Sequence, residues 1–458
     1  LEVLAVIRPP GAQRLQEARF HAAGCGIHDN PIQRQAQHVA LQPGPGQRAL
    51  AHAARPDDGQ QPVDDLGDAC DPCPLDPGND DDNDGVCFLD DNCPDIPNAG
   101  QADFDGREGA ELLRQRLSDA VDLRLRSDVP LGAFLSGGLD SSAIVALMAQ
   151  EGATGIRTFS IGFEDQPEEK GSEFEFSDQV VERYRSIHHK FLVPNQEVLE
   201  RLPEAVDAMS EPMFGQDAVA FYLLAEQVSK QIKVVQSGQG ADEVFGGYFW
   251  YPKMQQESGE PVERFRHHYF DRDHPEYLRM VTEKYAVGDI TGDYVAQRLS
   301  EAGADSFMDQ VLRLDVTTLI VDDPVKRVDN MTMAWGLEAR VPFLDHELVE
   351  LAAQSPPEFR LREEGKYPLK RIARGILPDA VIDRPKGYFP MPALKYVRGD
   401  FLAFMRDILD SQACRERGIF NRKYIDMLLS APEMHHTRIQ GSKLWHMAVF
   451  EYWLQRHL

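Results

Sequence analysis

The chain has 458 residues and a formal net charge of −27. This length allows roughly two to four domains, each with a hydrophobic core. The excess of acidic groups argues against a nucleic acid or an anionic membrane surface as the main partner. No apolar run approaches the ~20 residues that a membrane-spanning helix needs, and residues 1–7 are too short for a signal peptide. We therefore expect a cytoplasmic protein and, because the chain opens at Leu1 rather than Met, a fragment or an ill-defined start.

The first 60 residues are rich in Gln, Ala, Pro, Arg and His and show no sustained helical or strand period. The stretch Gln-Pro-Gly-Pro-Gly-Gln at 42–47 is typical of low-complexity sequence. Such a composition buries little apolar surface. We predict that residues 1–60 are poorly ordered and carry no chemistry.

Residues 61–106 form a second region with a very different composition. From residue 56 to 106 there are sixteen Asp and no Glu, Lys or Arg. Asp80, Asp82 and Asp84 precede Gly85, and alternate carboxylates of this kind can converge on one hard cation while the glycine lets the loop turn. Four of the six cysteines also lie in this region: Cys70, Cys73, Cys87 and Cys93.

A second acidic set follows at Asp103 and Asp105, and the order of these motifs resembles the thrombospondin type 3 repeat. In that family calcium and disulfides replace a hydrophobic core. The resemblance implies these calcium ligands: Asp80, Asp82, Asp84, Asp91, Asp103 and Asp105. A solvated acidic linker and a zinc site on the cysteines are the alternatives. An EF-hand fits less well, because Asp91 stands where the loop would carry Glu.

From Arg107 onward, helical and strand-like segments alternate. This alternation predicts a parallel sheet with helices on both faces, and helical patterns alone dominate after about residue 260. We therefore expect an α/β domain over residues 107–458 whose C-terminal half is mostly helical. The expected elements are a helix over 111–126, a strand ending at 135, a helix after 140, a strand over 157–163, a helix over 176–184, a strand over 189–193, a helix over 221–228 and a strand over 232–236.

The turn Ser-Gly-Gly-Leu-Asp-Ser-Ser at 136–142 lies between a predicted strand and a predicted helix. Gly137 and Gly138 permit a tight turn, and a helix N-terminus favours an anion such as a phosphate. Asp140 fits such a site when a cation such as magnesium lies between it and the phosphates. Neither a Walker loop nor a hydrolase elbow matches these residues, and an ordinary glycine-rich connection is the alternative.

A second turn, Ser-Gly-Gln-Gly-Ala-Asp-Glu at 237–243, directly follows the strand over 232–236. Turns at the carboxyl ends of parallel strands can face one crevice, so Asp140 and Asp242 can share one magnesium ion. A third segment at 322–345 contains Met331 and Met333, which we expect in the core. It also contains Glu338 and Arg340, for which a structural ion pair is one interpretation.

A fourth segment carries the cations that an ATP-cleaving site needs for its leaving group. It contains Lys366 and Lys370 and then Arg-Pro-Lys-Gly at 384–387. Lys386 lies in a glycine-proline loop and suits this purpose. Lys366 and Lys370 are equally consistent with solvated charges on a helix.

The four segments together resemble the synthetase domain of the glutamine-hydrolysing asparagine synthetases, within the ATP-pyrophosphatase superfamily. The resemblance implies an adenine nucleotide alpha hydrolase-like fold, with ATP and magnesium, that activates a carboxylate as an acyl-adenylate for attack by ammonia. It implies catalytic roles for Asp140, Asp242, Glu243 and Lys386, with Asp140 and Asp242 as magnesium ligands. The nucleotide would be held by Leu135, Ser136, Gly137, Gly138, Asp140, Ser141, Ser142, Ile161, Ser237, Gly238 and Lys386.

The chain also departs from that family. Gln239 stands where many members have Glu, and Asn330 replaces an Arg. Nothing in residues 1–106 matches the family's N-terminal glutaminase domain, and Cys25 lacks the context of its nucleophile. The chain would therefore use free ammonia or a glutaminase partner, or be a piece of a longer enzyme; a homo-oligomer is compatible with the sequence.

The carboxylate substrate is a small molecule whose identity stays open at this point. Gln239, Asn330 and the aromatic residues at 444–453 resemble relatives that amidate N-acetylglutaminylglutamine, and a β-lactam synthetase is a further alternative. From a different class of protein, a calcium-stabilised extracellular binding protein with an inactive synthetase-like domain is also compatible with the sequence.

Overall fold

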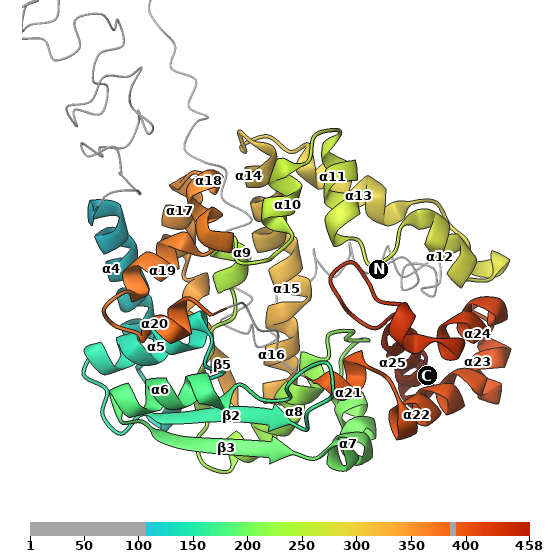
Figure 1. Ribbon diagram of the computed structural model, residues 1–458, viewed down its shortest axis with the longest axis horizontal. Helices are drawn as coiled ribbons and strands as arrows, with labels where there is room; N and C mark the ends of the chain where they lie inside the picture. The colour runs from blue at the N-terminus through green and yellow to red at the C-terminus, as the bar shows by residue number, and fades with distance from the viewer. Residues whose placement is uncertain (1–106, 385–390) are drawn as a thin grey trace, which may run out of the picture.

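The computed structural model describes residues 107–384 and 391–458, which are coloured in Figure 1. The low-complexity segment 1–60 lies outside the described residues, and so does the acidic segment 61–106 with all its candidate calcium ligands. Lys386 also lies outside them. What the structure describes is the predicted α/β region.

Five parallel strands form one sheet, in the order β3-β2-β1-β4-β5. The chain enters at β1 in the middle and adds strands outward on both sides, so the strand order reverses beside β1. This confirms the predicted parallel sheet. The strands are β1 (Leu131–Phe134), β2 (Arg157–Phe163), β3 (Ile187–Val193), β4 (Val234–Gln236) and β5 (Glu338–Arg340).

Helices cover both faces of the sheet, as predicted. Successive side chains of a strand point to opposite faces, so Ala133 and Leu135 enter one hydrophobic core and Phe134 enters another. The first core lies under α4 (Arg107–Leu123), α5 (Leu139–Gln150), α6 (Phe174–Tyr184), α17 (His346–Gln354), α19 (Tyr367–Ala373) and α20 (Asp379–Ile382). The second lies under α7 (Asn195–Ala208), α8 (Asp217–Ser229) and α16 (Pro324–Met333).

The second core continues into the C-terminal helices, which gather at one end of the sheet in Figure 1. They are α21 (Pro392–Lys395), α22 (Gly399–Asp410), α23 (Gln412–Arg417), α24 (Arg422–Ser430) and α25 (Lys443–His457), with α12 (His274–Met280) beside them. A third, aromatic-rich core joins α10 (Tyr251–Gln256), α11 (Pro261–Tyr269), α13 (Ile290–Leu299) and α14 (Phe307–Leu314).

Short elements complete the described chain, and the second half is mostly helical as predicted. They are α9 (Ala241–Phe245), α15 (Ile320–Asp322), α18 (Pro357–Arg360), a π-helical turn η2 (Asp315–Leu319) and the 3-10 turns η1 (Glu283–Tyr285), η3 (Pro342–Leu344), η4 (Arg362–Glu364) and η5 (Pro432–Met434). No helix within the described ranges has the length and apolar character needed to cross a lipid bilayer.

Two features of residues 331–340 differ from the sequence prediction. Met331 is fully buried as expected. The prediction that Met333 is buried is wrong, because Met333 is the last residue of α16 and 53% of it is exposed. Glu338 and Arg340 do pair, with Arg340 Nε donating to Glu338 Oε1 at 2.7 Å, yet they also form strand β5 at the sheet edge. A strand with one buried residue, Ala339, leaves no apolar run for a sequence pattern to detect.

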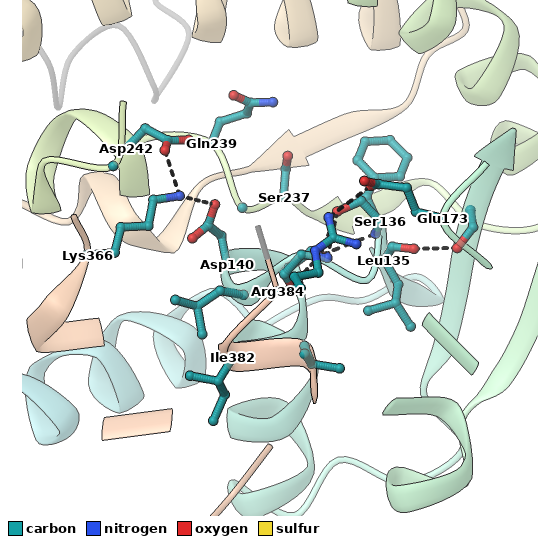
Figure 2. A pocket seen from close by; sticks show the side chains of 18 of the residues that line it. Leu135, Ser136, Asp140, Glu173, Ser237, Gln239, Asp242, Lys366, Ile382 and Arg384 are labelled. Atoms are coloured by element: carbon teal, nitrogen blue, oxygen red, sulfur yellow. Dashed lines mark hydrogen bonds and ion pairs between the residues drawn. The ribbon is translucent and has the colours of Figure 1, made fainter. Parts of the chain in front are cut away.

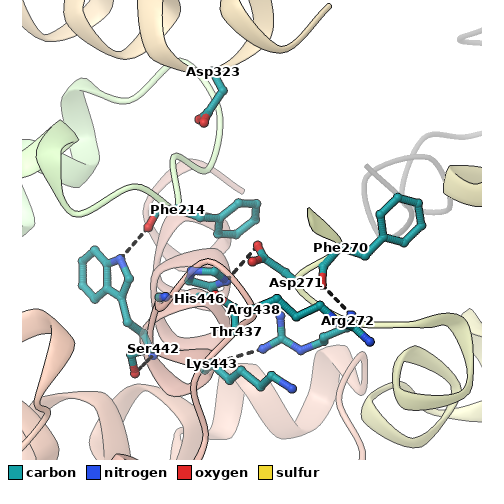
Figure 3. Close-up of polar contacts among 12 residues, drawn as sticks. Phe214, Phe270, Asp271, Arg272, Asp323, Thr437, Arg438, Ser442, Lys443 and His446 are labelled. Carbon is teal, nitrogen blue, oxygen red and sulfur yellow. Dashed lines mark hydrogen bonds and ion pairs between the residues drawn. The ribbon is translucent and has the colours of Figure 1, made fainter. Parts of the chain in front are cut away.

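Polar contacts fix α25 against two loops of the second core (Figure 3). Trp445 Nε1 donates to the carbonyl oxygen of Phe214 at 2.8 Å, and Arg272 Nη2 donates to that of Lys443 at 3.1 Å. His446 Nδ1 lies 3.6 Å from Asp271 Oδ2, and burial lowers the pKa of His446 to about 4. His446 is therefore neutral at physiological pH, and this cluster connects the C-terminal helix to the loop before α8.

Replacing Gly137 by Ala should destabilise the protein more than replacing Gly152 by Ala. Both glycines have positive φ, +79° and +86°, so each alanine should cost about 1–2 kcal/mol in backbone strain. A Cβ on Gly137 would also lie 2.6 Å from Ser177 N and 2.8 Å from Phe176 Cβ, whereas nothing lies within 4 Å at Gly152. Urea unfolding of the two variants measures the difference; equal midpoints would show that α6 does not pack against this turn as described.

Candidate active site

The two glycine turns lie side by side at the carboxyl ends of neighbouring strands β1 and β4. A Cβ on Gly238 would lie 3.0 Å from both Asp140 Cβ and Ser141 N, so the close approach of the two turns favours glycine at this position. The turns border a cavity of about 230 Å³, to which both contribute lining residues. The structure thus brings the two motifs together at one place.

The first turn presents the N-terminus of α5 to this cavity. Gly138 is the N-cap residue and offers no side-chain cap, so an anion would satisfy the first amide groups of the helix. Ser136 Oγ accepts a hydrogen bond from Gly138 N at 3.2 Å and lies 3.1 Å from Ser141 Oγ, which closes the turn. Ser136, Gly138, Asp140 and Ser141 line the cavity.

Two of the residues predicted to hold the nucleotide, Gly137 and Ser142, lie in the turn but not on the cavity wall. Gly137 provides its positive φ and lies against α6, and Ser142 is fully buried within α5. Neither is among the cavity-lining residues. Sequence patterns identify the whole motif but do not separate the members that face the cavity from those that shape the backbone.

Leu135, Ile161 and Gly238 all line the cavity, which is where the resemblance places adenosine. The backbone groups of Phe159 face β1, since its carbonyl oxygen accepts from Leu135 N. The backbone groups of Ile161, two residues later in β2, face the same side, but β1 has already ended at Phe134, so they face the cavity instead. Leu135 already has partners within the protein: its N–H donates to Phe159 O at 2.8 Å, and its carbonyl accepts from Ser160 Oγ. Ile161 therefore offers the better exposed backbone edge.

Lys366 lies between the two predicted magnesium ligands (Figure 2). Its Nζ is 2.6 Å from Asp140 Oδ2 and 2.7 Å from Asp242 Oδ1. Burial acts to lower the pKa of Lys366, but the two carboxylates outweigh it and hold the pKa above its usual value. Of the two possibilities left open for this lysine, a solvated helix charge is wrong, since only 7% of the residue is exposed.

A second cation, Arg384, covers the first turn and was given no role by sequence reasoning. Its Nη2 donates to Glu173 Oε2 at 3.0 Å, its guanidinium lies 4.6 Å from the centre of the Phe176 ring, and both Arg384 and Glu173 line the cavity. Arg384 Nη1 is buried without a hydrogen-bond partner among the described residues. Burial raises the pKa of Glu173, and Arg384 opposes the shift. In the sequence, the only indication of a role for Arg384 was its position at the start of the Arg-Pro-Lys-Gly segment at 384–387.

Glu243, predicted as catalytic, lies behind the cavity rather than on its wall. It is 1% exposed and accepts a hydrogen bond from the Tyr248 hydroxyl at 2.7 Å. Nearby, the Tyr251 hydroxyl donates to Asp315 Oδ2 at 2.5 Å within the π-helical turn η2. Burial raises the pKa of Asp315 to about 8; the hydrogen bond from Tyr251 opposes the shift, and the negative charge of Glu243 adds to it. These buried groups support α9, which carries Asp242.

The two departures from the family pattern lie in different places. Gln239 lines the cavity. Asn330 does not: its Oδ1 accepts from Ser210 N at 2.8 Å and its Nδ2 donates to Ala208 O at 3.2 Å, so it fixes the end of α7. Any direct effect on a bound ligand is therefore expected from Gln239.

The sheet order, the two facing turns and the cations over a helix N-terminus define an α/β protein of the adenine nucleotide alpha hydrolase-like class. A model of the asparagine synthase family matches residues 112–455. The chain belongs to this family.

The relatives carry consistent names. Glutamine-hydrolyzing asparagine synthetase 1 of Bacillus subtilis is 28% identical over 384 residues, covering 74% of this chain and 58% of the relative. Asparagine synthetase 3 of the same organism is 30% identical, with 69% and 54% covered, and a putative asparagine synthetase of Mycobacterium bovis is 29% identical, with 74% and 56% covered. The chain thus spans somewhat over half the length of these relatives.

Replacing Asp315 by Asn should remove a pH dependence of stability. An aspartate in the unfolded chain ionises near pH 4 whereas Asp315 keeps its proton to about pH 8, so the folded state binds the extra proton in this window and loses stability as the pH rises, by up to about 1.4 kcal/mol per unit. Urea unfolding between pH 5 and pH 8 should show this slope in the wild type and a flatter one in the variant. Tyr251→Phe keeps the carboxyl and should keep the slope; parallel curves for wild type and Asp315→Asn would contradict the assignment.

Proposed function

We propose that this chain catalyses ATP-dependent amide formation, in which a carboxylate is activated as an acyl-adenylate and then attacked by ammonia. The observation that carries the proposal is the convergence of Asp140 and Asp242 on one cation beside the N-terminus of α5. Membership of the asparagine synthase family supports the same reaction class. Because the chain spans about half the length of its relatives, the activity is proposed for this part of the protein.

The cavity fits a nucleotide with its triphosphate on the first turn. Helix α5 directs its first amide groups there, and Ser136 and Ser141 add hydroxyl donors. Asp140 and Asp242 would hold a magnesium ion, since their oxygens already reach one common point. Bound there with the triphosphate, magnesium would neutralise charge on the phosphate oxygens.

In the first step, a carboxylate oxygen of the substrate attacks the α-phosphorus and pyrophosphate leaves. Negative charge then develops on the leaving group, and positioned cations lower its energy. Arg384 and Lys370 line the cavity beside the turn and can supply this charge, and Lys386 would join them from outside the described residues. In the second step, ammonia attacks the acyl carbon, AMP leaves, and the ammonium proton passes to water or a nearby base.

The names of the relatives suggest a source for the ammonia. The two Bacillus subtilis relatives are named as glutamine-hydrolyzing asparagine synthetases. We propose that this chain accepts ammonia from a glutaminase domain or subunit and accepts free ammonium as well. Within the asparagine synthase family, N-acetylglutaminylglutamine and aspartate are the two acceptors to compare, because Gln239 replaces a carboxylate by an amide on the cavity wall.

Pyrophosphate exchange into ATP tests adenylation directly. Exchange should require magnesium and one acceptor carboxylate, offered as aspartate and as N-acetylglutaminylglutamine in separate reactions. Asp140→Asn and Asp242→Asn should each lower the exchange rate by at least about a hundredfold, because the transition-state charge loses its stabilisation. The matched control is Asp122→Asn on the exposed surface of α4, which should exchange within twofold of the wild type.

Acceptor-dependent exchange that survives in both aspartate variants would refute the assigned roles of the carboxylates. A folded wild type that binds ATP but exchanges with neither acid, at any ammonium concentration, would contradict amide formation by way of these two acceptors.

Replacing Gln239 by Glu should weaken the binding of the acceptor carboxylate more than the binding of ATP. The new carboxylate would share the cavity wall with Asp140 and Asp242 and repel the acceptor carboxylate, so the KM for the acceptor should rise about tenfold or more. The KM for ATP should change less than about threefold. Steady-state kinetics with each substrate varied measures both constants; equal changes in the two would show that Gln239 does not face the acceptor.

A further inference from the structure

We propose that Lys366 is a built-in counter-cation of Asp140 and Asp242, which keeps a divalent ion from entering alone and admits it together with the nucleotide. This inference rests on the proposed function, because it takes the two aspartates as the metal ligands. It adds an order of binding that the proposed reaction by itself does not require.

Geometry places the ammonium group of Lys366 where a shared metal ion would lie. Nζ contacts Asp140 Oδ2 at 2.6 Å and Asp242 Oδ1 at 2.7 Å, and the three residues come from three separate segments of the chain. Figure 2 shows Lys366 reaching across to both carboxylates from the start of α19. One cation thus already bridges the two acidic turns.

The backbone around Lys366 is shaped to deliver this side chain. Lys366 has φ +56°, a conformation that costs a non-glycine residue about 1 kcal/mol or more, and Gly365 before it has φ +100°. A Cβ on Gly247 would lie 2.1 Å from Lys366 Cε and 2.2 Å from Asp242 Oδ1. A Cβ on Gly365 would lie 2.1 Å from Gly246 O. The Lys366 side chain is therefore closely packed along its length, unlike a surface lysine that reaches an acid by chance.

Charge explains the order of binding. The two carboxylates and Lys366 sum to −1, so a divalent ion that arrives alone must either displace the ammonium into a buried, uncompensated position or lie beside it. A nucleotide triphosphate brings several negative charges and new oxygen ligands. With the nucleotide present, both the metal ion and the displaced ammonium have anionic partners, and the exchange becomes favourable.

Lys370 provides a matched control on the same helix. It lies one turn after Lys366 and lines the same cavity, but its Nζ donates to the carbonyl oxygen of Glu363 rather than to an aspartate. Lys366→Met and Lys370→Met therefore remove the same charge and nearly the same side chain from one cavity. Only the first removes the bridge between Asp140 and Asp242.

The test measures Mn²⁺ binding by electron paramagnetic resonance, with Mn²⁺ alone and with Mn²⁺ plus a non-hydrolysable ATP analogue. Wild type and Lys370→Met should bind Mn²⁺ alone at least tenfold more weakly than Lys366→Met does. Adding the analogue should tighten Mn²⁺ binding to the wild type at least tenfold. The double variant Lys366→Met with Asp242→Asn should lose the gained affinity.

Equal Mn²⁺ affinity of wild type and Lys366→Met without nucleotide would overturn the proposal, and so would tight binding that persists in the double variant. If Lys366→Met fails to fold, the wild-type measurements still test the proposal. Equal affinity of the wild type for Mn²⁺ with and without the analogue would contradict the proposed order of binding. Failure of the proposed function gives a different result: Mn²⁺ with the analogue would then bind equally well to wild type and Asp242→Asn.

Discussion

Two carboxylates from neighbouring turns converge on one buried lysine, and this ion triplet constrains much of the surrounding structure. Asp140 and Asp242 can meet only because β1 and β4 are adjacent and parallel, so that both turns leave the same edge of the sheet. Gly238 leaves room where the turns approach each other, and Gly247 leaves room for the Lys366 side chain. A buried group of three charges is stable only while all three partners stay in place, so the site and the fold depend on each other.

The sequence was most informative where chemistry and backbone geometry coincide. The alternation of strand-like and helical segments predicted the parallel sheet. The glycine turn around Asp140 and the acidic turn around Asp242 predicted the common cavity, because glycines and acids at a strand end leave a distinctive pattern. The pattern could not predict Lys366, since a lysine near a helix start resembles a solvated charge until the fold brings two acids to it. Arg384 was missed for the same reason: its partner Glu173 is distant in sequence and shows no motif.

Differences between the structure and the expectations from sequence also have physical causes. Met333 lies in an apolar pattern, yet it ends α16 and faces solvent, whereas Met331 two residues earlier is fully buried. β5 has a single buried residue and is held by backbone pairing to β4. Glu243 belongs to the same acidic motif as Asp242, but successive side chains of a helix point about 100° apart, so Asp242 lines the cavity while Glu243 meets Tyr248 in the protein interior. Motif membership therefore does not decide which residue reaches the cavity.

A crystal structure with magnesium and a non-hydrolysable ATP analogue tests the central claim most directly, because it shows the metal, the triphosphate and Lys366 together. We expect a magnesium ion bonded to oxygens of both Asp140 and Asp242 at about 2.0–2.1 Å, the triphosphate at the N-terminus of α5, and Lys366 Nζ moved from the carboxylates to a phosphate. A nucleotide bound elsewhere would contradict the assigned site. Magnesium held by the phosphates alone, with Lys366 still bridging both aspartates, would contradict the role given to the ion triplet.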